Sequence, residues 1–160
     1  MAYTTTGTIT GMDVFQRAIT MMDELNDEGK YKYEDTDEYR HRTLAILNIL
    51  QNELYPYSDT FPKWQEWEQG RRPVLMSMED LYSTIDLDDY CSGTVLPYGL
   101  AAHLLLDENP TAANFFQQRY DELKMALMRG EGRQTVSEDI EDVYGPRGGV
   151  HPYNEFSMWA

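Results

Sequence analysis

The sequence predicts an all-α fold: a small bundle of four to five helices with a kinked central helix, an antiparallel helical hairpin and long loop and tail extensions. Apolar residues recur at spacings of three and four in several segments, which is the period of an amphipathic helix. The intervening segments are rich in Gly, Pro and acidic residues, and the short stretch 71–75 is the one candidate strand. We expect a single helical domain over residues 1–130 and a C-terminal extension or arm over 131–160.

The first helix is expected from about Gly11 to Asn26. Thr10 suits its N-cap, and Asp13 stands three positions later, as in the acidic variant of a capping box. Gly29 lies in the polar stretch that follows and is the expected terminator. The apolar face of this helix consists of Val14, Phe15, Ala18, Met22 and Leu25.

A second helix is expected to begin at Asp35 or Thr36 and to end near Leu54, before Pro56. Acidic residues occupy its first turn, where they complement the positive end of the helix dipole. The connection that follows, residues 55–77, is long for a compact domain and rich in aromatic residues, so we expect it to pack on the chain itself or to bind a partner. The apolar stripe of the helix consists of Leu44, Leu47, Leu50 and Leu54.

The centre of the chain is apolar but carries helix-breaking residues. An S-x-x-D cap signal predicts a short helix over 78–84. Acidic residues then open a helix over about 87–107, which contains Pro97 and Gly99. Since a helical proline clashes with the carbonyl four residues earlier, and that residue is Gly93, we interpret the three breakers as one kink that lets the helix curve around its neighbours.

The last predicted helix covers residues 110–129. Asn109 and Pro110 are suited to its N-cap and first position, and Gly130 is the expected terminator. Because only a short break separates it from the preceding helix, the two are expected to form an antiparallel hairpin. Its apolar face consists of Ala113, Phe116, Tyr120, Leu123 and Leu127.

Composition narrows the possible functions. The formal net charge is −15, a field that repels phosphate backbones, so a DNA-wrapping role is not expected. No apolar run reaches the ~18 residues that span a bilayer, and the first residues lack the pattern of a secretory signal. The single cysteine, Cys91, excludes an intrachain disulfide and favours synthesis in a reducing, cytoplasmic compartment.

No catalytic, metal or cofactor site emerges from the sequence. Glu38 and His41 form half of a Glu-x-x-His di-iron motif, but the second half is missing. His103 lacks the partners of a metal site, and Cys91 has no recognisable histidine base. We therefore expect a protein that is not an enzyme and needs no cofactor.

The candidate partner interface consists of aromatic residues in two long segments, because Trp and Tyr dominate the energetics of protein interfaces. Packing on the chain's own core is favoured for the first two of them, in the 55–77 connection. For the three in the C-terminal tail, self-packing and partner binding are equally favoured. These residues are Trp64, Trp67, Tyr153, Phe156 and Trp159.

The segment LDDYCSGTVLPYGLAAHLLLDENPTAANFFQQRYDELKMAL, residues 87–127, resembles the small head-to-tail connector (adaptor) proteins of tailed phages and prophages. The matching features are an apolar helix over 96–106, an acidic break over 107–110 and an aromatic second helix over 115–123. Residues 43–59 also look like the preceding helix of prophage members. The resemblance covers about half of the chain.

This resemblance implies a structural protein that docks beneath the portal and self-associates into a ring around the DNA passage, without reading the DNA sequence. Its implied partners are the portal and other neck or tail proteins, with no membrane involved. It would reside in the cytoplasm of the bacterial host during assembly and in the virion neck afterwards. The 55–76 connection and the 131–160 tail would contact neighbouring subunits.

Two alternatives remain open. The first is a small helical adaptor or regulatory protein of the host, which binds a protein partner through Trp64 and Trp67. The second is a lysozyme-like phage neck protein, which needs two carboxylates on either side of a sugar-sized cleft. The many acidic residues offer no pair that the sequence alone singles out.

Overall fold

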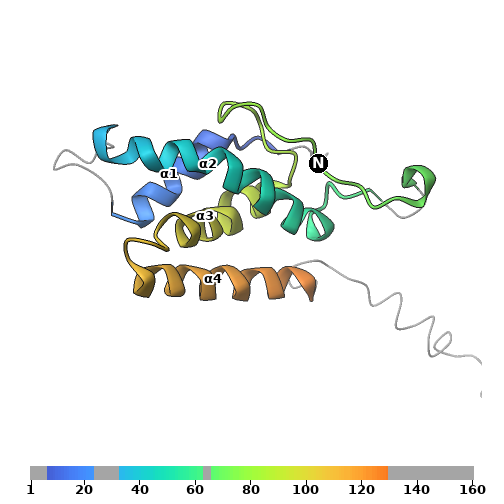
Figure 1. The fold of residues 1–160 in the computed structure, drawn as a ribbon. Helices are drawn as coiled ribbons and strands as arrows, with labels where there is room; N and C mark the ends of the chain where they lie inside the picture. The colour runs from blue at the N-terminus through green and yellow to red at the C-terminus, as the bar shows by residue number, and fades with distance from the viewer. Residues whose placement is uncertain (1–6, 24–32, 63–65, 130–160) are drawn as a thin grey trace, which may run out of the picture. The chain divides into compact units, whose positions relative to one another are not determined.

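The structure, a computed structural model, describes residues 7–23, 33–62 and 66–129. The chain separates into Met1–Arg129 and Gly130–Ala160, and the second part lies outside the described residues. Within the described residues all regular structure is helical, with a single isolated β-bridge between Thr10 and Thr84. The predicted all-α bundle is therefore confirmed (Figure 1).

Four α-helices form the described part of the bundle. The central helix, α3, contacts each of the other three, and Figure 1 shows it between α2 and α4. Short helical turns connect or extend these helices. In chain order the elements are α1 (Gly11–Met21), α2 (Tyr33–Leu54), the 3-10 turns η1 (Tyr55–Tyr57) and η3 (Glu68–Gly70), the π-helical turn η4 (Cys91–Val95), α3 (Leu96–Leu104) and α4 (Pro110–Met128).

The α3 helix is buried on almost every side, so its sequence is apolar around the whole helix and not along one stripe. This position accounts for the most apolar stretch of the chain. The buried residues of α3 are Leu96, Pro97, Gly99, Leu100, Ala101, Ala102 and Leu104. The same core includes Val14, Phe15, Ala18 and Ile19 of α1, and Leu47, Leu50 and Leu54 of α2.

The predicted capping box at the start of α1 is confirmed. The Asp13 N–H donates to the Thr10 hydroxyl at 3.2 Å, and the Thr10 N–H donates to the Asp13 carboxylate at 3.0 Å. The helix ends at Met21, earlier than predicted, because Asp23 adopts a left-handed conformation with φ of 61°. The predicted final turn and its glycine terminator fall within 24–32, outside the described residues.

The helix predicted over 78–84 is absent from the structure, where this segment forms turns. The Asp80 carboxylate accepts from the N–H groups of Tyr82 and Ser83 at 2.8 and 2.9 Å, which satisfies locally the donors that a helix would use. The carbonyls of Leu81 and Ser83 instead accept from the first N–H groups of α1, at 2.6 and 3.2 Å. The residues of the predicted cap signal therefore form a turn whose carbonyls accept from the first N–H groups of α1.

The helix predicted over 87–107 is shorter and less regular than expected. It begins at Asp89 and ends at Leu104, and its first part is the π-helical turn η4. The Leu96 N–H donates to the carbonyl of Cys91, five residues back. A π-helical turn commonly appears where a regular helix is locally disturbed, and here it directly precedes Pro97. The predicted irregularity is real, and its form is a π turn.

Gly93 has a different role from the predicted one of relieving a clash at the kink. Pro97 has no N–H to donate, so the carbonyl of Gly93 lacks its ordinary helical partner. It accepts instead from Arg17 Nη1 of α1, at 2.7 Å. A Cβ on Gly93 would lie 2.6 Å from Ile9 Cδ1 and closer still to Arg17 Nη1. Glycine at this position therefore makes room for two side chains from the N-terminal part of the chain.

Gly99 is also not part of a kink, because it lies inside regular α3. A Cβ there would lie 2.9 Å from two ring atoms of Tyr120 and 3.1 Å from Leu50 Cδ1. Gly99 thus allows α3 to approach both α4 and α2 closely. The interpretation of Gly93, Pro97 and Gly99 as one kink is therefore wrong. Pro97 directly follows a π-helical turn, whereas Gly93 and Gly99 are sites where other side chains approach the helix closely.

The predicted helical hairpin is formed by α3 and α4, which run antiparallel side by side (Figure 1). The Asn109 side chain caps α4 by accepting from the Ala112 N–H at 3.1 Å, and Pro110 is the first helical residue. The helix ends at Met128, one residue earlier than predicted. Its buried face consists of Ala113, Phe116, Tyr120 and Leu123.

Replacing Tyr120 with Phe is expected to leave the free energy of unfolding unchanged or to raise it by about 1 kcal/mol. The Tyr120 hydroxyl is buried and makes no hydrogen bond of regular geometry, since its contact with the nearby Glu53 carboxylate is a weak one; a buried hydroxyl left without a good partner costs about 1–3 kcal/mol. Burial and the nearby Glu53 carboxylate also raise the pKa of Tyr120 well above its usual range, so the hydroxyl stays neutral. Urea unfolding of both proteins measures the difference, and a clear loss of stability in the variant would show that the hydroxyl is bonded.

Candidate functional site

The long connection after α2, residues 55–78, is the main candidate site and is called the arm below. Among the described residues of its first half, the rings of Tyr55, Phe61 and Trp67 pack together. The Phe61 ring packs edge-to-face on Tyr55, with ring centroids 5.0 Å apart, and on Trp67, at 5.6 Å. The Trp67 indole N–H donates to the carbonyl of Pro62 at 3.0 Å. The arm therefore has an aromatic cluster of its own.

The second half of the arm is fastened to α2 by three amide side chains. The Met78 N–H donates to the Asn48 side chain at 2.7 Å, and the Leu75 N–H donates to Asn52 at 2.9 Å. Gln51, which is almost fully buried, donates to the carbonyl of Met76 at 3.1 Å. These bonds replace the strand partner that an extended segment would otherwise need, and they hold the backbone of the arm in a fixed place.

The fastened arm exposes apolar side chains to solvent. Val74 is 73% exposed and Met76 is 89% exposed, whereas the backbone around them is anchored. The adjacent basic pair Arg71 and Arg72 is exposed as well. Apolar side chains exposed singly, such as Ile49, are normal on a protein surface, whereas neighbouring ones such as Val74 and Met76 on an anchored backbone offer a contact surface to another protein.

The first half of the arm is anchored to the start of the central helix by Asp88. Its carboxylate caps the helix by accepting from the Cys91 N–H at 2.9 Å, and it accepts from the Asp59 N–H and the Ser58 hydroxyl at 3.0 and 2.9 Å. Burial opposes the charged form, but these hydrogen bonds outweigh it and lower the pKa of Asp88. The arm and the helix start therefore share one carboxylate.

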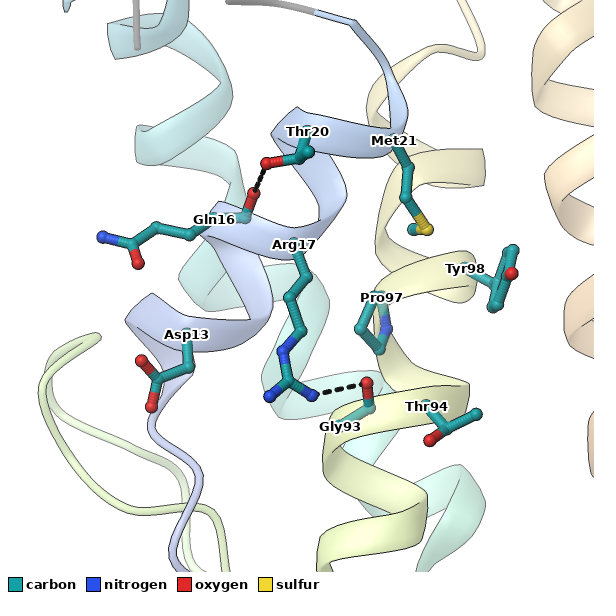
Figure 2. Close-up of a pocket in the computed structure, with 9 residues that line it drawn as sticks. All are labelled: Asp13, Gln16, Arg17, Thr20, Met21, Gly93, Thr94, Pro97 and Tyr98. Atoms are coloured by element: carbon teal, nitrogen blue, oxygen red, sulfur yellow. Dashed lines mark hydrogen bonds between the residues drawn. The ribbon is translucent and has the colours of Figure 1, made fainter. Parts of the chain in front are cut away.

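A separate open groove of about 530 Å³ lies between α1 and the helical stretch η4–α3 (Figure 2). Its polar groups are largely used within the chain: Arg17 donates to the carbonyl of Gly93, and the Thr20 hydroxyl donates to the carbonyl of Gln16. The Asp13 carboxylate accepts from Thr10. The groove thus results from how α1 sits against the π turn, and the charged side chains of its described lining, Asp13 and Arg17, are bonded within the chain.

Side chains that could act in catalysis or metal binding are dispersed in the described part of the chain. No group of three or more His, Cys, Asp and Glu side chains gathers there to hold a metal ion. Cys91 is fully buried, whereas Glu38, His41 and His103 are exposed. None of the helices in these described ranges is both long and apolar enough to cross a membrane.

The structure places one of the five aromatic residues that the sequence nominated as a partner interface. Trp67 is half-buried in the aromatic cluster of the arm. The other four, Trp64, Tyr153, Phe156 and Trp159, lie outside the described residues. Sequence reasoning missed Asn48, Gln51 and Asn52, which fasten the arm. The one sequence feature that could have indicated this anchoring is the group of amide residues beside the leucine stripe of α2.

Comparison with protein-family models, with curated proteins and with solved structures gives no match for this chain.

Proposed function

We propose that this chain is a structural assembly protein, the head-to-tail connector of a tailed phage or prophage, which docks beneath the portal and forms a ring around the DNA passage. The observation that carries this proposal is the arm: an anchored segment whose apolar side chains Val74 and Met76 are exposed. A subunit that must hold neighbours in a ring needs such a preformed contact surface, because a fixed backbone reduces the entropy lost on binding.

The charge of the chain supports the same proposal. With a net charge of −15, the protein repels DNA at long range, so DNA would pass a ring of such subunits without sticking to it. The arm differs from this background, since it carries the adjacent basic pair Arg71 and Arg72. In the proposed ring, the arm and the 131–160 tail contact neighbouring subunits and the portal.

The two alternatives have less support. The host-adaptor alternative relies on Trp64, which lies outside the described residues, and on Trp67, whose ring packs on Phe61 and whose N–H is bonded to the carbonyl of Pro62. The lysozyme-like alternative needs two carboxylates across a cleft. The α1–α3 groove has one carboxylate in its described lining, that of Asp13, which accepts from Thr10. A smaller groove beside α2 is lined by the carboxylates of Asp37 and Asp80, and that of Asp80 is bonded to the backbone of its own turn.

The double variant Val74→Glu/Met76→Glu is expected to abolish ring assembly on the portal while the protein stays folded. Two charges placed in an apolar contact are costly to desolvate, whereas both side chains are largely solvent-exposed in the free protein. The measurement is electron microscopy of each protein mixed with the portal encoded in the same phage or prophage genome, with circular dichroism as the folding check.

Ile49→Glu is the matched control, because Ile49 is 69% exposed on α2 and lies outside the arm. It is expected to assemble like the wild type. A wild-type protein that forms no ring with its portal would contradict the connector proposal. A double variant that assembles normally would instead show that the arm is not the contact surface.

A further inference from the structure

The outer face of α4 carries a regular stripe of exposed residues. It lies opposite the face that packs on α3, and its members recur at the spacing of four and three that characterises a coiled-coil seam. Phe115 is 63% exposed and Met125 is 50% exposed, although both are large and apolar. Polar side chains occupy the middle of the stripe. In order, the stripe consists of Phe115, Gln118, Glu122 and Met125.

The residue types along the stripe are arranged symmetrically: an apolar residue stands at each end and a polar residue at each of the two inner positions. Phe115 and Met125 stand equally far from Tyr120 on its two sides, and so do Gln118 and Glu122. Reversing the helix therefore places an apolar residue on an apolar residue and an amide on a carboxylate. A surface with this property is complementary to itself, which is what an isologous two-fold interface requires.

The charges beside the stripe fit the same arrangement. Arg119 and Glu122 lie one helical turn apart on the same edge and pair at 3.0 Å, with side chains 47% and 52% exposed. Gln118 donates to the same Glu122 carboxylate at 3.4 Å. A second copy in reversed orientation brings its own Arg–Glu pair to this edge. Two arginines and two glutamates then alternate around this edge, so each of these four charges has an opposite charge beside it. On the other edge of the stripe, Asp121, which accepts from Gln117, lies near the partner's Asp121.

We propose that the outer faces of two α4 helices pack antiparallel and form a homodimer of this chain in solution. Phe115 packs against the partner's Met125, a favourable contact between an aromatic ring and a thioether, and Arg119 pairs with the partner's Glu122. The occupant of this face is a second copy, because a face complementary to itself fits its own copy better than an unrelated surface. The dimer is the form of the protein before assembly, and it does not depend on the connector role.

Sedimentation equilibrium of the full chain tests this proposal. The wild type is expected to be dimeric at micromolar concentration, and Phe115→Glu is expected to raise the dimer dissociation constant by about tenfold or more, as for the loss of a central apolar anchor. Ile49→Glu places the same charge on an exposed apolar position of α2 and should leave the constant unchanged. Circular dichroism of each variant verifies that it is folded.

Charge reversal tests the orientation of the helices. Arg119→Glu is expected to weaken the dimer, because it faces the partner's Glu122 with a like charge, and Arg119→Glu/Glu122→Arg is expected to restore it. A wild type that stays monomeric, or a dimer that Phe115→Glu leaves intact, overturns the proposal. A dimer in which the double variant is no tighter than the single one overturns the antiparallel register. Ring assembly on the portal is a separate measurement, so failure of either proposal is recognised without the other.

Discussion

Gly99→Val is expected to lower the free energy of unfolding by about 3 kcal/mol, the upper part of the range for overpacked cores. Even a single carbon at this position would lie 2.9 Å from two atoms of the Tyr120 ring and 3.1 Å from Leu50 Cδ1. Both neighbours are buried and close-packed, so they have no free space to move into. Valine adds two further methyl groups to that contact.

Two further substitutions separate this clash from helix propensity. Ala126→Val places valine in α4 at a half-buried position, where it should cost only about 0.5 kcal/mol through propensity. Gly99→Ala should be intermediate, because the helix gains about 1 kcal/mol when alanine replaces glycine while the contact with Tyr120 tightens. Urea unfolding measures all three. If Gly99→Val were as stable as Ala126→Val, α3 and α4 would not be in close contact at this position.

The helices that are amphipathic and capped by local signals follow directly from the sequence. The α1 and α4 starts are examples, because Thr10 with Asp13 and Asn109 with Pro110 specify their caps through neighbouring residues alone. A local cap signal also predicted a helix over 78–84, and this prediction was wrong. There the competing partners of the backbone belong to α1, about seventy residues earlier in the chain, and no local pattern reports such a contact.

The role of the two helical glycines was also beyond local reasoning. Pro97 predicts an irregular helix, and the π turn before it confirms this prediction. However, the reason for Gly93 lies in Arg17 of α1, and the reason for Gly99 lies in Tyr120 of α4. A glycine kept for close approach and a glycine kept for bending look identical in a single sequence. Only the packing of the helices distinguishes them.

The arm was recognisable as a feature but not as an anchored one. Its length and aromatic content indicate a segment that either packs on the chain itself or binds a partner. The contact between Phe61 and Trp67 is an example of packing within the chain. In the sequence, Asn48 and Gln51 are not distinguishable from other polar positions of α2. Their hydrogen bonds to the backbone of the arm depend on the tertiary fold. The exposed Val74 and Met76 become informative only once that backbone is known to be fixed.

Asp88→Ala is expected to lower the free energy of unfolding by about 2 kcal/mol at neutral pH, because an N-cap is worth about 0.5–2 kcal/mol and hydrogen bonds to a charged group are among the stronger ones. The carboxylate caps the central helix through Cys91 and holds the arm through Ser58 and Asp59. Asp88→Asn is the matched variant. Asparagine also caps helices well, but its NH2 group cannot accept from the arm.

The pH dependence of stability follows from the lowered pKa of Asp88. A carboxyl group with a lower pKa in the folded protein than in the unfolded chain binds fewer protons when folded, so it stabilises the fold above the unfolded pKa of about 3.9. That stabilisation is lost as the pH falls through the folded pKa. Other carboxyl groups titrate in the same range, so the informative quantity is the difference between wild type and Asp88→Asn. Urea unfolding from pH 7 downward should show this difference shrinking below about pH 4. A difference that stays constant would mean that the charge of Asp88 contributes nothing and that the cap alone holds the helix and the arm together.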